Sequence, residues 1–495
     1  MVTSGQGKGG DNKDMESVLN NGSGFDYMRM FINMQECGTD EFASTWLTGE
    51  QTTGLTYLSW DANDAWVSDM YYRIYYNIAL CNEFLRNANS ASFSGADAEK
   101  MKEYKAEVRF MRALFYYHAL DFYRNIPMVT ENDPVGSYIP PRYTPQQTFD
   151  YIESELKDCV GDMLPASTCP YGQASQGAAY TLLAKLYLNS EVYTGVAKYA
   201  ECKEACKKVM DMGYSLESDY SKLFNADNDK RTNEIIFALP VSAEHTVSWG
   251  SSTYLVCGQV SMSNANQNVA DYGVTAGWSE FRLRPEFVDK FTQTDIDGGG
   301  DKRCKFFTNG QSKDVTSMTD ETTGYLSEKW SNLKDDGTTA SNTADAGVET
   351  DYPLFRLADV YLMYAECVAR LGEDWDNWDG GSDAEAATRK EGAIYYINKV
   401  RERAYGDAEH NVWKDNFASD ADFLQFILDE RARELYHEGY RRTDLIRFGE
   451  FTTNKYIWQW KGGTHDGQAV DSKYNIYPIP NTELTANPNL HNDNY

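Results

Sequence analysis

The run Lys105-Ala106-Glu107-Val108-Arg109-Phe110-Met111-Arg112-Ala113 lies inside a longer periodic segment, residues 96–123, and this segment decides the fold class. Its apolar residues form one stripe, made of Val108, Met111, Phe115, Ala119 and Phe122. Spacings of three and four residues are those of one face of an α-helix. The pattern stops before Pro127, which cannot continue a helix. We therefore predict a long helix over about residues 96–123.

The segments on either side of this helix show the same periodicity. Alanine lies beside tyrosine or leucine at the packing positions of several blocks, as in tetratricopeptide-like helix pairs. The predicted fold is therefore all-α and built from such pairs. The further helices are expected over about residues 64–86, 144–163, 175–190, 198–212, 354–371, 385–404 and 421–437.

Between the two helical regions the periodicity fades, and Gly, Ser, Thr, Asn and Asp become frequent. A short strand is predicted at residues 234–239 of this loop-rich insertion. Near the end of the chain, Tyr477-Pro478-Ile479-Pro480 must be extended. We expect four parts: a flexible leader (1–14), an N-terminal helical region (15–218), the insertion as a ligand-binding segment (219–350) and a C-terminal helical region (351–495).

Composition and charge exclude several classes of function. The 495 residues include 75 acidic and 46 basic side chains, which leaves a formal net charge of −29. This charge argues against a nucleic-acid partner, because such binding depends on neutralising phosphates with Lys and Arg. No run of 18 apolar residues is present, so no transmembrane helix is expected. The nine cysteines are an odd number, and most are predicted to be buried free thiols.

Motifs that carry chemistry are absent: the sequence has no G-x-S-x-G, H-E-x-x-H or Walker A pattern. Residues 295–301 resemble part of a calcium loop but lack its later glutamate, which favours a plain acidic turn. His118 lies in an apolar helical block and is predicted to be a core residue. Glu430, Glu434 and Glu438 share one helix face, which favours an ion-pair network with the arginines that follow over a catalytic cluster. No catalytic residue, metal or cofactor is predicted.

Several stretches, taken as a set, resemble the SusD/RagB family of outer-membrane nutrient-binding lipoproteins. They follow the family's order over about residues 60–495, and one departure is Arg124-Asn125, where the family often has Gly-Asp. The stretches are KAEVRFMRA from 105 with YRNIPMV from 123, PLFRLADVYLMYAE from 353, INKVRERA from 397, ERAREL from 430 with EGYRRTDLIRFG from 438, and YPIP from 477.

This resemblance implies an all-helical fold with four tetratricopeptide-like units. It also implies a lipoprotein at the cell surface, in the outer membrane, that captures a glycan and hands it to a TonB-dependent, SusC-like transporter. The family's lipid-bearing cysteine would then lie before Met1, since Cys37 is too far into the chain to be the anchor.

Ligand-binding residues are expected among aromatic side chains in polar loops, because sugar rings pack their apolar faces on aromatic planes while amides, carboxylates and arginines bond the hydroxyls. Two regions fit this expectation. The first region contains Trp46, Trp60, Asp61, Asn63 and Trp66. The second region contains Trp249, Tyr254, Tyr272, Trp278, Arg282 and Trp330.

Three other functions compete with non-catalytic glycan capture. The same scaffold could take peptides or glycopeptides, with the acidic charge favouring basic ones. An all-helical glycoside hydrolase is a further alternative, because 75 acidic residues guarantee chance pairs of carboxylates. A tetratricopeptide scaffold could also bind only protein partners.

Overall fold

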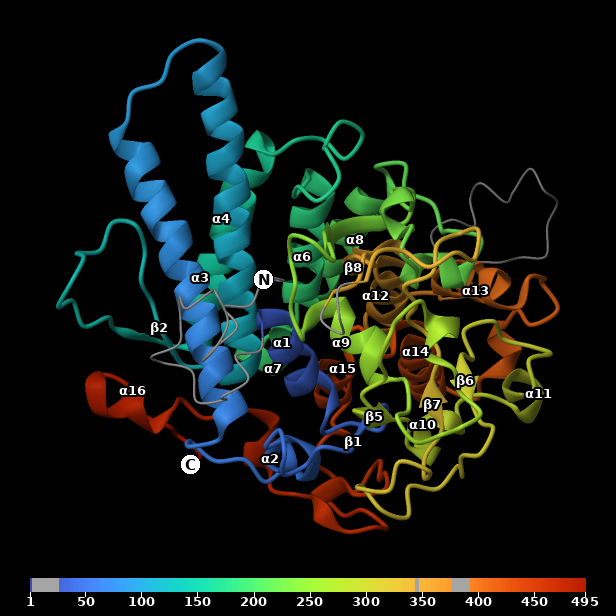
Figure 1. The fold of residues 1–495 in the computed structure, drawn as a ribbon. Helices are drawn as coiled ribbons and strands as arrows, with labels where there is room; N and C mark the ends of the chain where they lie inside the picture. The colour runs from blue at the N-terminus through green and yellow to red at the C-terminus, as the bar shows by residue number, and fades with distance from the viewer. Residues whose placement is uncertain (2–25, 343–346, 376–391) are drawn as a thin grey trace.

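The computed structural model describes Met1 and residues 26–342, 347–375 and 392–495. Among these residues the fold is all-α with short strands, as predicted (Figure 1). The helices of the first half are α1 (Tyr27–Glu36), α2 (Thr53–Tyr57), α3 (Ala65–Ser90), α4 (Ala96–Tyr123), α5 (Pro145–Cys159), α6 (Gln176–Leu188), α7 (Ser190–Thr194) and α8 (Tyr199–Met210). Those of the second half are α9 (Ser251–Gly258), α10 (Pro285–Val288), α11 (Gln293–Ile296), α12 (Leu357–Arg370), α13 (Ala393–Tyr405), α14 (Asp420–Leu435), α15 (Arg441–Arg447) and α16 (Asn481–Ala486).

The strands of the described residues pair only in twos, and each pair is antiparallel. The pairs are β1 (Ala43–Ser44) with β5 (Phe281–Arg282), β2 (Ile126–Pro127) with β3 (Arg142–Tyr143), β4 (Ile235–Leu239) with β8 (Tyr352–Arg356), and β6 (Phe306–Phe307) with β7 (Leu326–Ser327). Two of these pairs, β1–β5 and β4–β8, join segments that are far apart in the chain.

The long hairpin of α3 and α4 projects from the body of the molecule (Figure 1). Asp64 starts α3, since its carboxylate accepts hydrogen bonds from the amides of Trp66 and Val67. The stripe predicted on residues 96–123 packs inward, with Phe115, Ala119 and Phe122 buried. Further along, α6 packs on α8 and α8 on α12, so successive helix pairs share one hydrophobic core.

Among the described residues, eight helices were not predicted, and one predicted helix is shorter than expected. The unpredicted helices are α1, α2, α7, α9, α10, α11, α15 and α16, of which α1 with ten residues and α9 with eight are the longest. The helix expected from residue 354 begins only at Leu357, because Tyr352–Arg356 is strand β8. The prediction was wrong there because an apolar run of this length suits a buried strand as well as a helix. The leader from residue 2 to 14 and the start of the helix expected over 385–404 lie outside the described residues.

The buried face of α14 carries the predicted ion-pair network. Glu434 accepts bonds from Arg356 at 3.0 Å and Arg403 at 2.5 Å, and its pKa is lowered to about 2 by these guanidiniums against the opposing effect of burial. Glu430 contacts Arg303. Glu438 was predicted on the same helix face, but α14 ends at Leu435, and Glu438 contacts Arg356 from beyond the helix. These basic residues come from the insertion, β8 and α13. The arginines after α14 were expected to pair with these glutamates, but they pair with other carboxylates: Arg441 with Asp40, Arg442 with Asp121 and Arg447 with Glu366.

His118 and the cysteines lie as the sequence indicated. The ring of His118 is buried against Phe31 and shares a 2.6 Å hydrogen bond with the hydroxyl of Tyr27. Burial lowers the pKa of His118 to about 3, so the ring is neutral. All nine cysteines are free, and seven of them are buried. Among the described residues, no helix combines the length and the apolar character needed to cross a bilayer.

Candidate functional site

Three of the predicted aromatic residues gather at one exposed place. Trp46 is 38% exposed, Trp249 is 44% exposed, and Trp278 is partly exposed. Trp46 and Trp278 touch directly, because the indole Nε1 of Trp46 donates a 2.9 Å hydrogen bond to the carbonyl oxygen of Trp278. We call Trp46, Trp249 and Trp278 the tryptophan surface.

The pairing of β1 with β5 explains why residues 232 positions apart meet. Ala43 pairs with Arg282 and Ser44 with Phe281, so Trp46 leaves one strand beside the point where residue 278 approaches the other. The ladder continues outward, since the amide of Thr45 donates to the carbonyl of Glu280 at 2.8 Å. The two indoles are therefore placed by backbone hydrogen bonds and do not depend on a flexible loop.

Helix α9 fixes the other side of the surface. Its C-terminal carbonyls accept amide hydrogens from the Trp278 segment: Cys257 from Trp278 at 2.9 Å and Gly258 from Glu280 at 2.8 Å. Trp249 lies two residues before the N-terminus of the same helix. One rigid element thus spaces Trp249 from Trp278.

Asp26 locks the segment that carries Trp249. Its carboxylate caps α1 through the amide of Arg29 and accepts a 2.6 Å bond from the hydroxyl of Ser248. The same carboxylate leaves no room for a side chain at position 250, where a Cβ would lie 2.1 Å from Asp26 Oδ1. The sequence therefore needs glycine directly after Trp249.

Arg29 of α1 ties all three segments together beneath the rings. Its Nη1 donates to the carbonyl of Trp249 at 2.8 Å, and its Nη2 donates to Glu280 Oε1 at 3.0 Å and also bonds Glu50. The guanidinium lies 4.1 Å from the ring centroid of Tyr254 and is only 2% exposed. Arg29 therefore organises the surface from within and presents no open positive charge to solvent.

Backbone strain accompanies each of the three segments. Gln51, Ser251 and Ser279 adopt φ angles of 59°, 46° and 51°, a left-handed conformation that costs a side-chain-bearing residue about 1 kcal/mol or more. Each lies within five residues of one of the tryptophans. Strain of this kind persists where the surrounding structure fixes the backbone, and it gathers at functional sites.

A polar loop that sequence reasoning missed lies beside Trp278. The amide of Met262 donates to Ser279 Oγ at 2.7 Å, which places residues 261–268 next to the tryptophan surface. The side chains of Ser263, Asn266 and Asn268 in this loop are exposed. Hydroxyls and amides of this kind bond sugar hydroxyls, and the only signal for them in the sequence was the density of Asn and Ser.

Six of the sequence-predicted residues are buried, so their side chains offer no face to a ligand. Trp60 bonds the hydroxyl of Tyr495, Trp66 bonds the carbonyl of Glu50, and Trp330 stacks on Tyr352. The others are Tyr254, bonded to Asn33, Tyr272, bonded to Glu328, and Arg282, whose guanidinium bonds the carbonyls of residues 317, 318, 320 and 323. Burial rather than residue type separates them from the tryptophan surface.

Asp61 and Asn63 are exposed, but they belong to a different place on the molecule. The side-chain oxygen of Asn63 accepts a 2.7 Å hydrogen bond from the side-chain amide Nδ2 of Asn481, at the start of α16. Asp61 caps the turn before α3 by accepting from the amide of Asn63. The structure therefore associates these two residues with the C-terminal segment.

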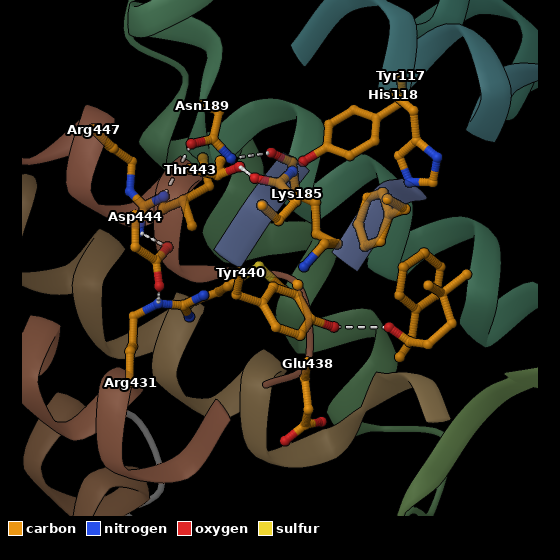
Figure 2. A pocket seen from close by; sticks show the side chains of 17 residues that line it. Tyr117, His118, Lys185, Asn189, Arg431, Glu438, Tyr440, Thr443, Asp444 and Arg447 are labelled. Atoms are coloured by element: carbon orange, nitrogen blue, oxygen red, sulfur yellow. Dashed lines mark hydrogen bonds and ion pairs between the residues drawn. The ribbon is translucent and has the colours of Figure 1, made fainter. Parts of the chain in front are cut away.

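An interior cavity lies between α1, α4, α6, α14 and α15 (Figure 2). Its volume is about 30 Å³, which suits one or two water molecules. The polar groups around it bond one another: Arg431 and Arg447 both hold Asp444, at 2.7 Å each. We interpret this cavity as part of the packed core.

No group of three or more possible metal ligands is found within residues 26–342, 347–375 and 392–495. The carboxylates of the acidic turn that resembles a calcium loop bond other protein groups. Asp295 caps α11 and also accepts the amide of Asp301, and Asp301 pairs with the buried Arg303. These carboxylates are structural.

Fold and site together define an all-α protein of helix pairs that presents aromatic rings from the segments between its helices. Residues 305–495 match the model of a protein family described as "SusD family", and residues 12–188 match that of a family described as "Starch-binding associating with outer membrane". The starch-binding protein SusD of Bacteroides thetaiotaomicron is 32% identical, over 96% of this chain and 87% of that protein. The chain belongs to the SusD family.

Solved structures share the fold over nearly the whole chain. A SusD-like carbohydrate-binding protein from Bacteroides fragilis superimposes with a TM-score of 0.73 at 18% identity, covering 94% of each chain. Surface glycan-binding protein A from Bacteroides thetaiotaomicron, solved in complex with laminarihexaose, superimposes with a TM-score of 0.70 at 18% identity, again covering 94% of each chain.

Proposed function

We propose that this chain captures a glycan on the tryptophan surface and performs no bond breaking. The observation that carries the proposal is the convergence of the exposed Trp46 and Trp249 with the partly exposed Trp278, all on rigid supports, next to exposed hydroxyl and amide groups. Apolar sugar faces pack on such rings, and neutral polar groups bond the hydroxyls. Starch and laminarihexaose, named with relatives of this chain, are ligands of this chemical kind.

The charge around the surface favours a neutral glycan. Arg29 is buried and bonded to two carboxyl groups, and Glu321 lies beside Ser279 through a 2.7 Å hydrogen bond. A uronic-acid or sulfated polymer would meet the carboxyl group of Glu321 and the overall charge of −29. Repulsion of like charges at a contact costs free energy, so polyanions are disfavoured.

The same carboxyl groups are poorly placed for hydrolysis. Glu280 is 5% exposed, and Glu50 and Glu280 both bond the guanidinium of Arg29. A glycosidase needs two carboxyl groups that reach opposite sides of the scissile bond. This supports a binding protein over the hydrolase alternative.

The cellular role follows as a further part of the proposal. We infer that the protein is a surface lipoprotein of the outer membrane and passes its glycan to a TonB-dependent, SusC-like transporter. Support comes from the family description, which joins starch binding to outer-membrane association. We also propose the division at residues 15–218, 219–350 and 351–495, in which the insertion supplies Trp249 and Trp278.

Titration calorimetry tests the proposal. The purified protein is titrated with starch, laminarin and xylan as neutral glycans, with polygalacturonate as an anionic glycan, and with a basic peptide mixture. We expect binding heat with at least one neutral glycan and an affinity that changes little between 50 and 500 mM salt. We expect no binding heat with polygalacturonate. Salt-sensitive binding of basic peptides without any glycan binding would contradict the proposal and favour peptide capture.

A further inference from the structure

Two carboxyl groups meet beneath the tryptophan surface. Glu280 Oε1 accepts from Arg29 Nη2 at 3.0 Å, and Glu50 bonds the same nitrogen. The other oxygen of Glu280, Oε2, is buried and has no hydrogen-bond donor within the part of the chain that the structure describes. The side chains of Glu50 and Glu280 are 18% and 6% exposed. Two carboxylates on one guanidinium, largely out of water, leave one negative charge without compensation.

Among the residues that the structure describes, the groups that face this pair do not supply a second positive charge. On α1 and at its two caps they are Arg29, Asp26, whose carboxylate accepts the backbone amide of Arg29, and Cys37; on α9 the facing group is Tyr254. Burial raises the pKa of Tyr254 and of Cys37 well above their usual values, so both stay neutral. A bound proton would therefore neutralise the uncompensated negative charge of this pair.

We propose that Glu280 holds a proton at its contact with Glu50, that Glu280 acts as a positioning residue for the tryptophan surface, and that glycan affinity falls when this proton is lost. The proposal rests on the proposed function. Within it, the proton lies between the two carboxyl groups, and the unpartnered Oε2 of Glu280 becomes one end of a hydrogen bond.

The backbone connections of both residues transmit the effect to the rings. The carbonyl of Glu280 accepts the amide of Thr45, the residue before Trp46, and the amide of Glu280 is bonded to α9. The carbonyl of Glu50 accepts the indole of Trp66 at the start of α3. Repulsion between two ionised carboxylates therefore pushes the segment of Trp46 away from the segment of Trp278.

The electrostatic surroundings of Glu280 support this arrangement. Burial raises the pKa of Glu280 to about 8, and the neighbouring Glu50 adds to the rise, while Arg29 opposes it. At pH 7 about nine-tenths of the sites then carry the proton, and at pH 9.5 about one-thirtieth do. If only the protonated site binds, the apparent Kd rises by up to about thirtyfold over this range.

The test measures Kd for starch and for laminarin from pH 7 to 9.5 with wild-type protein, E280Q and the control E244Q. Glu244 is exposed near Trp249 and its side chain is 84% exposed. We expect Kd to rise at least tenfold for the wild type and for E244Q, and to lose its pH dependence in E280Q. An E280Q variant that keeps the full pH dependence would overturn the proposal.

A second measurement separates this inference from the proposed function. In ¹³C spectra of protein labelled at the glutamate carboxyl carbons, the wild type should show a resonance titrating near pH 8 that E280Q lacks. Absence of that resonance overturns the proton on Glu280 even if E280Q does not fold. Glycan binding with a flat wild-type pH profile overturns the coupling but leaves the proposed function standing, whereas the resonance without glycan binding contradicts the proposed function alone.

Discussion

Trp249 is the site residue whose ring can be tested for ligand binding with the least effect on folding. It is 44% exposed, and its carbonyl rather than its ring is bonded to Arg29. Covering about 60 Å² of apolar ring by a sugar face at about 25 cal/mol per Å² is worth about 1.5 kcal/mol, or about tenfold in Kd.

We therefore expect Trp249→Ala to weaken binding of the best neutral glycan about tenfold by calorimetry while the melting temperature changes by no more than about 2 °C. Trp413→Ala is the matched control, since Trp413 is 39% exposed in the segment between α13 and α14. Equal affinity for wild type and Trp249→Ala, or an equal loss in Trp413→Ala, would show that the ligand binds elsewhere.

The sequence could predict which residue types form the site, but not which of those side chains are exposed. Trp46 and Trp60 precede α3 and Trp66 is its second residue, yet Trp60 packs on Tyr477 and Trp66 is fully buried. Which ring stays outside depends on the β1–β5 pairing and on the C-terminal segment, and neither is visible in local periodicity. Arg29 gave no local signal either, because its three partners come from distant parts of the chain.

At the scale of elements, the N-termini of α1 and α9 meet through one carboxylate. Asp26 accepts from the amides of Arg29 and Ser251 and from Ser248 Oγ. The cap and the Trp249 segment are therefore coupled, and a change that displaces Asp26 should disturb both.

Gly250→Ala tests this coupling. The new Cβ would lie 2.1 Å from Asp26 Oδ1, so we expect a loss of about 1–3 kcal/mol in the free energy of unfolding, together with weaker glycan binding. Urea denaturation and calorimetry measure the two effects. Gly161→Ala is the control, because nothing lies within 4 Å of a Cβ there; equal effects of both variants would refute the coupling.

Helix α14 provides a second prediction at this scale. Removing the carboxylate of Glu434 leaves the buried guanidiniums of Arg356 and Arg403 with one carboxylate fewer, since among the described residues Glu234 alone then pairs with both. Glu434→Ala should cost about 3–5 kcal/mol in urea denaturation, whereas Glu201→Ala, at an exposed position on α8, should cost less than about 0.5 kcal/mol. A small loss in Glu434→Ala would mean that the network tolerates rearrangement.

The helices were predictable because their apolar stripes are long, and the bounds of α4 follow directly from one such stripe. Strand β8 was not, because residues 352–356 are all buried and lack the alternation that marks a half-exposed strand. α9 lies within the polar insertion, and its eight residues are too few for a periodic signal.

For the molecule as a whole, one set of buried carboxyl groups limits folding stability at low pH and another limits it at high pH. The pKa values of Asp40, Glu434 and Asp444 are lowered to about 2, because nearby guanidiniums outweigh burial. In contrast, burial raises the pKa of Glu36 to about 7, and its Oε2 has no donor among the described residues. Glu280 behaves similarly, with a pKa of about 8.

The signs follow from proton linkage. The lowered groups stabilise the fold above their unfolded pKa, near 4, and this stability is lost as the pH falls towards 2. The raised groups leave the fold at its full stability below their unfolded pKa, near 4.5, and stability is lost progressively from there until the pH passes the folded pKa values of about 7 and 8. We expect the unfolding free energy in urea to be highest near pH 5.

Glu36→Gln checks the alkaline side of this profile. A shift from 4.5 to about 7 corresponds to about 3 kcal/mol, so the variant should decline less than the wild type between pH 5 and 8 by an amount of that order. Parallel profiles for the two proteins would show that Glu36 is ionised in the folded state.

The central claim is that Trp46, Trp249 and Trp278 hold the ligand, and a crystal structure with a bound neutral oligosaccharide tests it most directly. The account predicts sugar rings packed on these indoles, with hydroxyls bonded in the loop of residues 261–268. An oligosaccharide bound at reproducible density elsewhere, with all three indoles left open to solvent, would contradict it.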